Sequence, residues 1–264
     1  MSWTLLRGTL HQRRSSIFWF CISLVLYSWM MVWFWDQMGD SLSKMIENYP
    51  PEILAMFGGD QVSFASMGGF FQIEYLGLMW MIIIASAVVL FAVKAYSGEI
   101  GGGTMELLLA QPLSRTRVAI TRVVAFIGYA LLLNVSTFIP IQVFGPGYGV
   151  ELGAETFWTV SALGLLFTLA IGGIAMLLSS LFRDGGKPAA IASGVLLFFW
   201  IADMIANVSE AAEFLDPVNL VSYWQPGEII NGGAAAPEAW WIYGALAVVT
   251  LAASIVVFSR RDVA

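Results

Sequence analysis

The stretch that decides the fold is IFWFCISLVLYSWMMVWFW, residues 17–35, which has 19 residues and no charged side chain. As a helix it would rise about 28 Å at 1.5 Å per residue, enough to cross the hydrocarbon core of a bilayer. The run ends in Trp33, Phe34 and Trp35 and is followed by Asp36, with no small-residue cleavage site. We therefore expect a membrane span and not a cleaved signal peptide.

Five further apolar runs follow along the chain, so we predict an all-α polytopic membrane protein with six transmembrane helices. The composition agrees, with 59% hydrophobic and only 11% charged residues, whereas about a quarter of the residues in soluble domains are charged. No composition shift marks a separate soluble part, and residues 1–264 are predicted to form one transmembrane permease domain. The further spans are expected at residues 75–96, 118–143, 157–182, 188–207 and 240–258, with residues 36–74 as a loop after the first span.

The charges are distributed unevenly between the two ends of the predicted bundle. If the N-terminus is inside, eleven of the twelve Lys and Arg residues and four of the eighteen acids lie on that side, a net charge of +7. The other side then holds Lys44 and the remaining fourteen acids, a net charge of −13. The positive-inside rule therefore predicts that both termini are cytoplasmic. We expect a multi-pass protein of the plasma membrane whose direct surroundings are the lipid bilayer.

Residues 97–117, between the second and third predicted spans, carry the most information. Three consecutive glycines, ending at Gly103, predict a flexible joint before a short amphipathic helix that ends at Pro112. Thr104 is interpreted as its N-cap, and Glu106 as complementing the helix dipole. Ser114 is interpreted as the N-cap of the third span. Met105, Leu108 and Leu109 are predicted to share one face of the short helix. A helix that merely lies at the membrane interface is the alternative interpretation.

This segment resembles part of the type-2 ABC transporter permeases. The likeness is carried by Glu99, by the run G-T-x-E-L-L-L at residues 103–109 and by P-L-S-R at residues 112–115. In that family the segment is the coupling helix, which binds the nucleotide-binding subunit. The resemblance thus implies that the following residues couple the chain to an ATPase: Glu99, Gly103, Thr104, Met105, Glu106, Leu107, Leu108, Leu109, Pro112, Leu113, Ser114 and Arg115.

Two other segments extend the resemblance over essentially the whole chain. Residues 1–16, with Arg7 and His11 among leucines, predict an amphipathic surface helix and resemble the family's cytoplasmic elbow helix. Residues 208–239 resemble the family's re-entrant outer loop before the last span, although Asp216-Pro217 stands where the family often has Ser-Pro. The resemblance implies two copies of an ATP-binding subunit, a second permease copy in a homodimer, and export of a small amphiphilic molecule, drug or lipid.

Nucleotide binding by this chain is not expected. A phosphate-binding loop needs G-x-x-x-x-G-K-[ST], whereas Thr104 stands where the lysine would follow Gly98 and Gly103. ATP and Mg²⁺ are therefore assigned to the partner subunit, and no cofactor, metal or nucleic acid is assigned to this chain. One His, His11, and one Cys, Cys21, give little basis for metal or Cys/His catalysis, so no catalytic residue is predicted.

A few polar residues within or beside the spans remain. Asn134, Thr137, Asp203 and Asn207 are predicted to line a translocation path. Bonding between neighbouring helices is the alternative for the first two, and solvation near the membrane interface is the alternative for Asp203. Arg115, Arg117 and Arg122 are interpreted as anchors to lipid headgroups. An ion-coupled secondary transporter or channel-like protein is the alternative function. It is less favoured, because only Asp203 comes close to an ionisable group at membrane depth.

Overall fold

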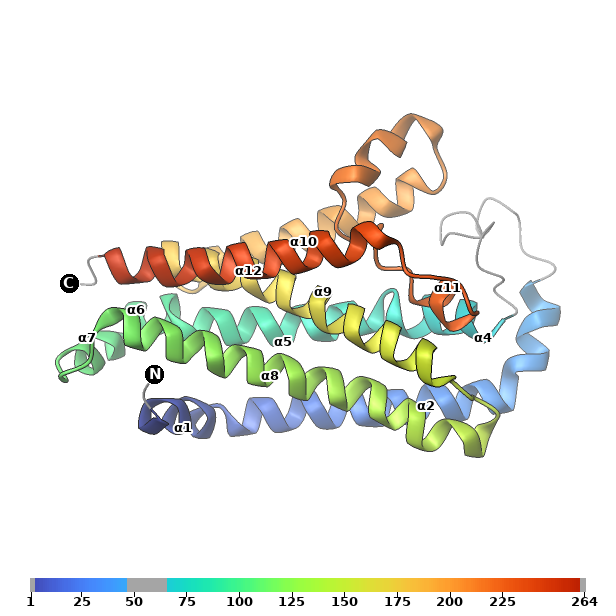
Figure 1. The fold of residues 1–264 in the computed structure, drawn as a ribbon, viewed down its shortest axis with the longest axis horizontal. Helices are drawn as coiled ribbons and strands as arrows, with labels where there is room; N and C mark the ends of the chain where they lie inside the picture. The colour runs from blue at the N-terminus through green and yellow to red at the C-terminus, as the bar shows by residue number, and fades with distance from the viewer. Residues whose placement is uncertain (1–2, 47–65, 262–264) are drawn as a thin grey trace.

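The computed structural model describes residues 3–46 and 66–261, and within them the chain is helical with no β-strand (Figure 1). The predicted all-α class is confirmed. Six helical stretches of the described residues are long and apolar enough to cross a membrane, which confirms the predicted spans. They cover Arg14–Gln37, Met67–Ala95, Arg115–Tyr148, Ala154–Leu181, Gly186–Ala206 and Pro237–Arg260.

The spans are joined by short helices at both ends of the bundle (Figure 1). In the figure's labels, the α-helices are α1 (Trp3–Gln12), α2 (Arg14–Ile46), α4 (Met67–Phe70), α5 (Met79–Ala95), α6 (Ser97–Gly101), α7 (Thr104–Leu109), α8 (Arg115–Phe144), α9 (Ala154–Leu181), α10 (Gly186–Ala206), α11 (Pro226–Ile230) and α12 (Pro237–Arg260). A π-helix, η1 (Phe71–Leu76), and two 3-10 helices, η2 (Gly145–Tyr148) and η3 (Glu210–Val218), complete the described elements.

The loop predicted at residues 36–74 is wrong at both of its ends. Helix α2 continues past Asp36 to Ile46, and helical structure resumes at Met67. One acid does not end a helix, and the first proline after Asp36 is Pro50. The middle of the predicted loop, residues 47–65, lies outside the described residues.

The second span is interrupted near the end that carries α11. The π-helix η1 follows α4, and the Gly77 amide donates to the Gln72 carbonyl over 2.8 Å. A Cβ atom built on Gly77 would lie 2.2 Å from that same oxygen. A π-bulge widens one turn, so a residue without a side chain is needed where the backbone closes in. The span resumes as α5 at Met79.

Helix α9 is the centre of the bundle and packs against α5, α8, α10 and α12. It is the most buried of the six spans, whereas α10 is the least buried. Small residues explain its position, because they let neighbouring helices come close inside a membrane. The ring of Phe126 on α8 occupies the space beside Gly172, and Thr250 on α12 lies beside Gly173.

Replacing Gly172 by alanine is expected to destabilise the protein by about 1–3 kcal/mol. The new Cβ would lie 2.0 Å from Cζ of Phe126, a buried ring that already packs against Phe91. The control is Gly128→Ala on α8, where a Cβ meets nothing within 4 Å; it should leave stability unchanged or raise it by up to about 1 kcal/mol, because a helical glycine costs more chain entropy than alanine. SDS-induced unfolding of the two purified variants measures the difference, and equal stabilities would contradict this packing.

The two ends of the bundle differ in what they carry. Helices α1, α6 and α7 and the end of α12 lie together at one end, here called the α7 end (Figure 1). Helices α4 and α11 lie at the opposite, α11 end. The predicted outer loop at residues 208–239 contains two short helical elements, η3 and α11.

At the α11 end, α11 is bonded to the start of the second span. The Gly68 amide donates to Oδ1 of Asn231 over 3.0 Å, and the Gly227 amide donates to Oε1 of Gln72 over 2.9 Å. Just before α11, the indole Nε1 of Trp224 donates to the carbonyl of Leu76 over 2.9 Å. The second half of the predicted outer loop is therefore fastened to the bundle.

Candidate functional site: the coupling segment

The segment between the second and third spans, residues 97–114, is here called the coupling segment. It begins with α6 and turns at three glycines into α7. Gly103 has a φ of 71°, in the left-handed region that favours glycine, and occupies the N-cap position of α7. The predicted N-cap role of Thr104 is therefore wrong. Thr104 is the first helical residue, and its hydroxyl donates to the Glu99 carbonyl over 3.2 Å, because the turn at Gly103 brings it back over α6.

Helix α7 has one buried and one exposed face. Met105 is fully buried, and Leu108 and Leu109 are half-buried against the core, which confirms that the three share a face. Glu106 points to the other side, and Leu107 is 73% exposed. The short helix is thus held by its apolar side and presents the other side at the α7 end.

The segment leaves α7 through Pro112 and Leu113, which is half-buried against the core. Ser114 is the N-cap of α8, as predicted, and its Oγ accepts from the Arg117 amide over 3.2 Å. Arg115 donates to the carbonyl of Arg261, just beyond the end of α12. The Arg261 guanidinium in turn donates to the carbonyl of Ser180 over 2.7 Å. The start of α8 is thereby tied to the ends of α9 and α12.

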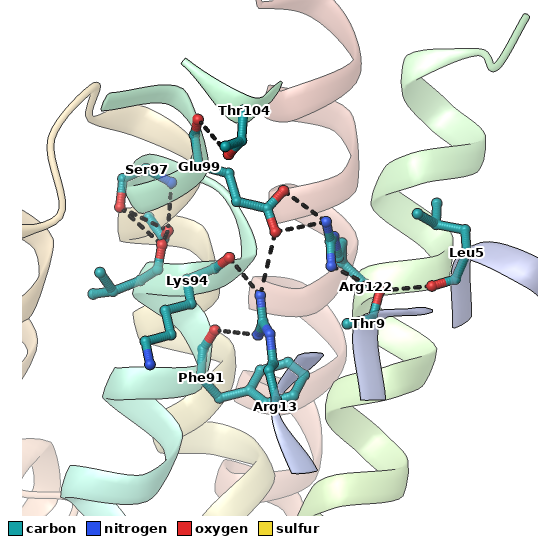
Figure 2. A network of polar contacts seen from close by, with 11 residues as sticks. Leu5, Thr9, Arg13, Phe91, Lys94, Ser97, Glu99, Thr104 and Arg122 are labelled. Atoms are coloured by element: carbon teal, nitrogen blue, oxygen red, sulfur yellow. Dashed lines mark hydrogen bonds and ion pairs between the residues drawn. The ribbon is translucent and has the colours of Figure 1, made fainter. Parts of the chain in front are cut away.

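Glu99, on α6, lies inside the protein and is paired there (Figure 2). Its side chain is 13% exposed, and both carboxylate oxygens accept from Nη2 of Arg122 on α8, over 2.7 and 2.6 Å. The other terminal nitrogen of Arg122, Nη1, donates to Oγ1 of Thr9 on α1 over 2.7 Å. The predicted lipid-anchor role of Arg122 is therefore wrong, since this guanidinium is buried between α1 and α6.

Arg13, between α1 and α2, approaches the same carboxylate from the other side. Its Nη2 lies 3.7 Å from Oε1 of Glu99 (Figure 2). The guanidinium also donates to the carbonyls of Phe91, over 2.8 Å, and Lys94 near the end of α5, and lies 4.4 Å above the Phe91 ring. Arg13 thus caps the C-terminal end of α5 by donating to backbone carbonyls of its last turn.

The three charged groups form a cluster with one negative and two positive charges, here called the Arg13–Glu99–Arg122 cluster. Burial, with a smaller contribution from Arg122, lowers the pKa of Arg13 to about 10, although Glu99 acts in the opposite direction. Burial also raises the pKa of Glu99, against the lowering effect of Arg122 and Arg13. Burial is the main cause of both shifts, so the cluster has little contact with water.

The start of α6 has a second attachment, to α9. The Ser97 amide donates to Oγ of Ser179 over 3.1 Å, and the two hydroxyls lie 3.0 Å apart. A Cβ on Gly101 would lie 2.9 Å from the Arg183 carbonyl, in the connection between α9 and α10. Helix α6 is therefore packed tightly against the bundle before the chain reaches α7.

The predicted translocation-path residues on α8 bond to other helices. Nδ2 of Asn134 donates to the Ser161 carbonyl on α9 over 2.8 Å. Oγ1 of Thr137 accepts from Nε1 of Trp80 on α5 over 3.0 Å, and the Thr137 carbonyl accepts from Ser28 on α2 over 2.9 Å. These contacts join neighbouring spans, and a role in translocation stays a prediction.

The other two predicted path residues lie near the α11 end of α10. Asp203 is half-buried, and Asn207 is the exposed C-cap residue, whose amide donates to the Asp203 carbonyl over 3.0 Å. A role for either in translocation also stays a prediction.

Sequence reasoning missed Thr9 and Arg13 as members of the site, and Arg122 as the partner of Glu99. One signal was present in the sequence. Arg122 lies about one turn inside a predicted span, and an ionisable residue at that position usually has a partner. The pattern did not say which acid it would be, because Glu106 and Glu99 are both nearby in the chain.

Six membrane-length helices, with a short helix partly exposed at one end of the bundle, define a multi-pass membrane protein. The profile of the family described as "ABC-2 family transporter protein" matches residues 9–263. The chain therefore belongs to the ABC-2 transporter family and is the membrane subunit of an ABC transporter, which works with an ATP-binding partner. Comparison with curated proteins gives no match.

Proposed function

We propose that the chain is the permease of an ABC exporter, in which two copies pair with each other and with two ATP-binding subunits that hold ATP and Mg²⁺. In this assembly the α7 end faces the cytoplasm at the plasma membrane, and both termini lie there. The excess of Lys and Arg at this end supports that orientation, because cytoplasmic ends of membrane proteins are enriched in these residues.

The observation that carries the proposal is the exposed side of α7, made of Glu106, Leu107 and Ala110 and here called the docking face. Leu107 is 73% exposed although the other side of the same helix is buried. An exposed leucine beside a carboxylate, on a helix held rigidly from behind, is suited to a groove with an apolar floor and a basic rim. Membrane subunits of ABC transporters work with an ATP-binding subunit, so we assign that subunit as the partner of the docking face.

The proposed cycle has two states of the permease pair. ATP binding would draw the two partner subunits together, and α7 would carry that movement to the spans, so that nucleotide favours one state over the other. The second half of the outer loop, bonded to α4 and η1 by Trp224 and α11, would close the exit as a re-entrant segment. The resemblance to exporter permeases supports a small amphiphilic molecule, drug or lipid as the substrate.

Purification of the chain from its native membrane tests the central claim. We expect an ATP-hydrolysing subunit to be recovered with the wild type in a fixed ratio. Leu107→Asp, which puts a charge at the centre of the docking face, is expected to weaken that association by about 30-fold or more, because an apolar anchor is typically worth about 2 kcal/mol or more.

The matched control is Leu107→Met, which keeps an apolar side chain of similar volume and should retain the subunit. Recovery of the subunit with Leu107→Asp at the wild-type ratio would show that α7 is not the contact. Reproducible isolation of the wild type as a lone, transport-competent protein would overturn the proposal and favour the secondary transporter.

A further inference from the structure

The Arg13–Glu99–Arg122 cluster joins elements that are far apart in the sequence. Each member comes from a different element (Figure 2). Thr9 lies on α1, and Arg13 lies at the junction between α1 and α2. Glu99 lies on α6 of the coupling segment, and Arg122 lies on α8, the third span. Because Arg13 also donates to carbonyls near the end of α5, the cluster reaches the first three spans together. Glu99 is the group on which both guanidinium groups converge.

Glu99 is also close to the docking face along the chain. Only the end of α6 and the glycine turn separate it from Thr104, whose hydroxyl donates back to the Glu99 carbonyl over 3.2 Å. A movement of α7 therefore displaces backbone that is only a few residues away from Glu99. The carboxylate itself is mostly buried and directed to α8 and Arg13, so it faces the bundle and not the partner.

The contact at this position is ionic. A charge-assisted hydrogen bond is directional and, at low dielectric, stronger than one between neutral groups. The pair is short, with nitrogen to oxygen distances of 2.7 and 2.6 Å, and both partners are shielded from water. It therefore resists separation of α6 from α8.

We propose that Glu99 is a positioning residue that makes the coupling segment, the α1–α2 junction and α8 move as one body when the ATP-binding subunit moves α7. This inference rests on the proposed function, and it adds a relay behind the docking face. Glu99 does not touch the ATPase; its task is to prevent α7 from moving without the spans. Helix α1 takes part through Thr9 and Arg13, so the predicted elbow helix belongs to the moving unit.

The relay is tested by the distance between α1 and the coupling segment in the assembled complex. Spin labels are placed at two exposed positions outside the docking face, His11→Cys on α1 and Gln111→Cys after α7, in a Cys21→Ala background. Pulsed electron-spin resonance then gives the distance distribution with the co-purified ATP-binding subunit, without nucleotide and after trapping with ATP and vanadate. Labelled chain is diluted with unlabelled chain, so that most complexes carry one labelled copy. In the otherwise wild-type chain we then expect one narrow distribution that does not shift between the two conditions.

Two variants break the relay without leaving an unpaired charge at position 122, although the first also removes the counter-charge of Arg13. Glu99→Gln/Arg122→Gln replaces the ion pair with two neutral amides, and Arg122→Lys keeps the charge but loses the fork that reaches Thr9 and Glu99 together. Both are expected to broaden the distribution and to make it shift with nucleotide. Asp184→Asn, an exposed acid at the same end that caps α10 through the Gly186 amide, is the matched control and should leave the distribution unchanged.

Each outcome decides the matter. A narrow, unshifted distribution in Arg122→Lys or in the double variant, with the ATP-binding subunit still bound, would overturn the relay alone. A nucleotide-dependent shift in the wild type would do the same, because α1 and the coupling segment would then move separately. Absence of any ATP-hydrolysing subunit from the wild-type preparation would overturn the proposed function together with the relay.

Discussion

Replacing Glu99 by glutamine is expected to lower the free energy of unfolding by about 3–5 kcal/mol, because the variant leaves two buried arginines without a counter-charge. Arg13 and Arg122 are 5% and 3% exposed, and Arg122 would keep only Thr9 as a strong acceptor. SDS-induced unfolding of the purified protein measures the change.

Two comparisons separate this charge effect from a general sensitivity of the region. Asp184→Asn removes an exposed acid at the same end and should stay within about 0.5 kcal/mol of the wild type. Glu99→Gln/Arg122→Gln should recover part of the loss, because it removes one of the two unpaired guanidinium groups while Arg13 still lacks its counter-charge. A single Glu99→Gln variant as stable as Asp184→Asn would contradict the buried cluster.

Replacing Trp224 by alanine is expected to cost about 3–5 kcal/mol, the usual loss for a buried tryptophan. Trp224 is 2% exposed, and its ring centroid lies 4.9 Å from that of Trp80 and 5.6 Å from that of Phe167. The substitution also leaves the Leu76 carbonyl, at the end of η1, without the indole donor. The same unfolding measurement applies, and hydrogen exchange of residues 219–231 should speed up because the second half of the outer loop loses its anchor.

Trp241→Ala is the matched control for this prediction. It removes the same side chain from the start of α12, where Trp241 is 79% exposed. In detergent it should change the free energy of unfolding by no more than about 0.5 kcal/mol, because few contacts are lost. Equal losses in the two variants would mean that Trp224 does not hold the outer loop to the second and fourth spans.

Much of the fold follows from local pattern. Uncharged apolar runs placed six spans close to their observed positions, and Ser114 was recognised as a helix cap from its own side chain. The spacing of Met105, Leu108 and Leu109 predicted which side of α7 is buried. The errors were also local in origin. The charge of Asp36 suggests the end of a helix that in fact continues, and Thr104 has the side chain of a cap although Gly103 occupies that position.

The sequence gives only a weak indication of the π-helix in the second span. Gly77 marks the place, but glycine in an apolar run is compatible with an ordinary membrane helix. What selects the wider turn is contact with residues more than a hundred positions away. The Trp224 indole and the Gly227 amide bond to Leu76 and Gln72 within this stretch. No local rule includes those partners.

Linear pattern predicts the membrane environment, the number of spans, the end that carries the basic residues and the short helix between the second and third spans. Each of these depends on hydropathy, charge or turn chemistry within one helix length, so a linear pattern is enough. Only the tertiary structure decided that Glu99 faces the bundle, between Arg13 and Arg122. A buried charge takes the partner that helix packing brings to it, and that packing depends on side chains from the whole chain.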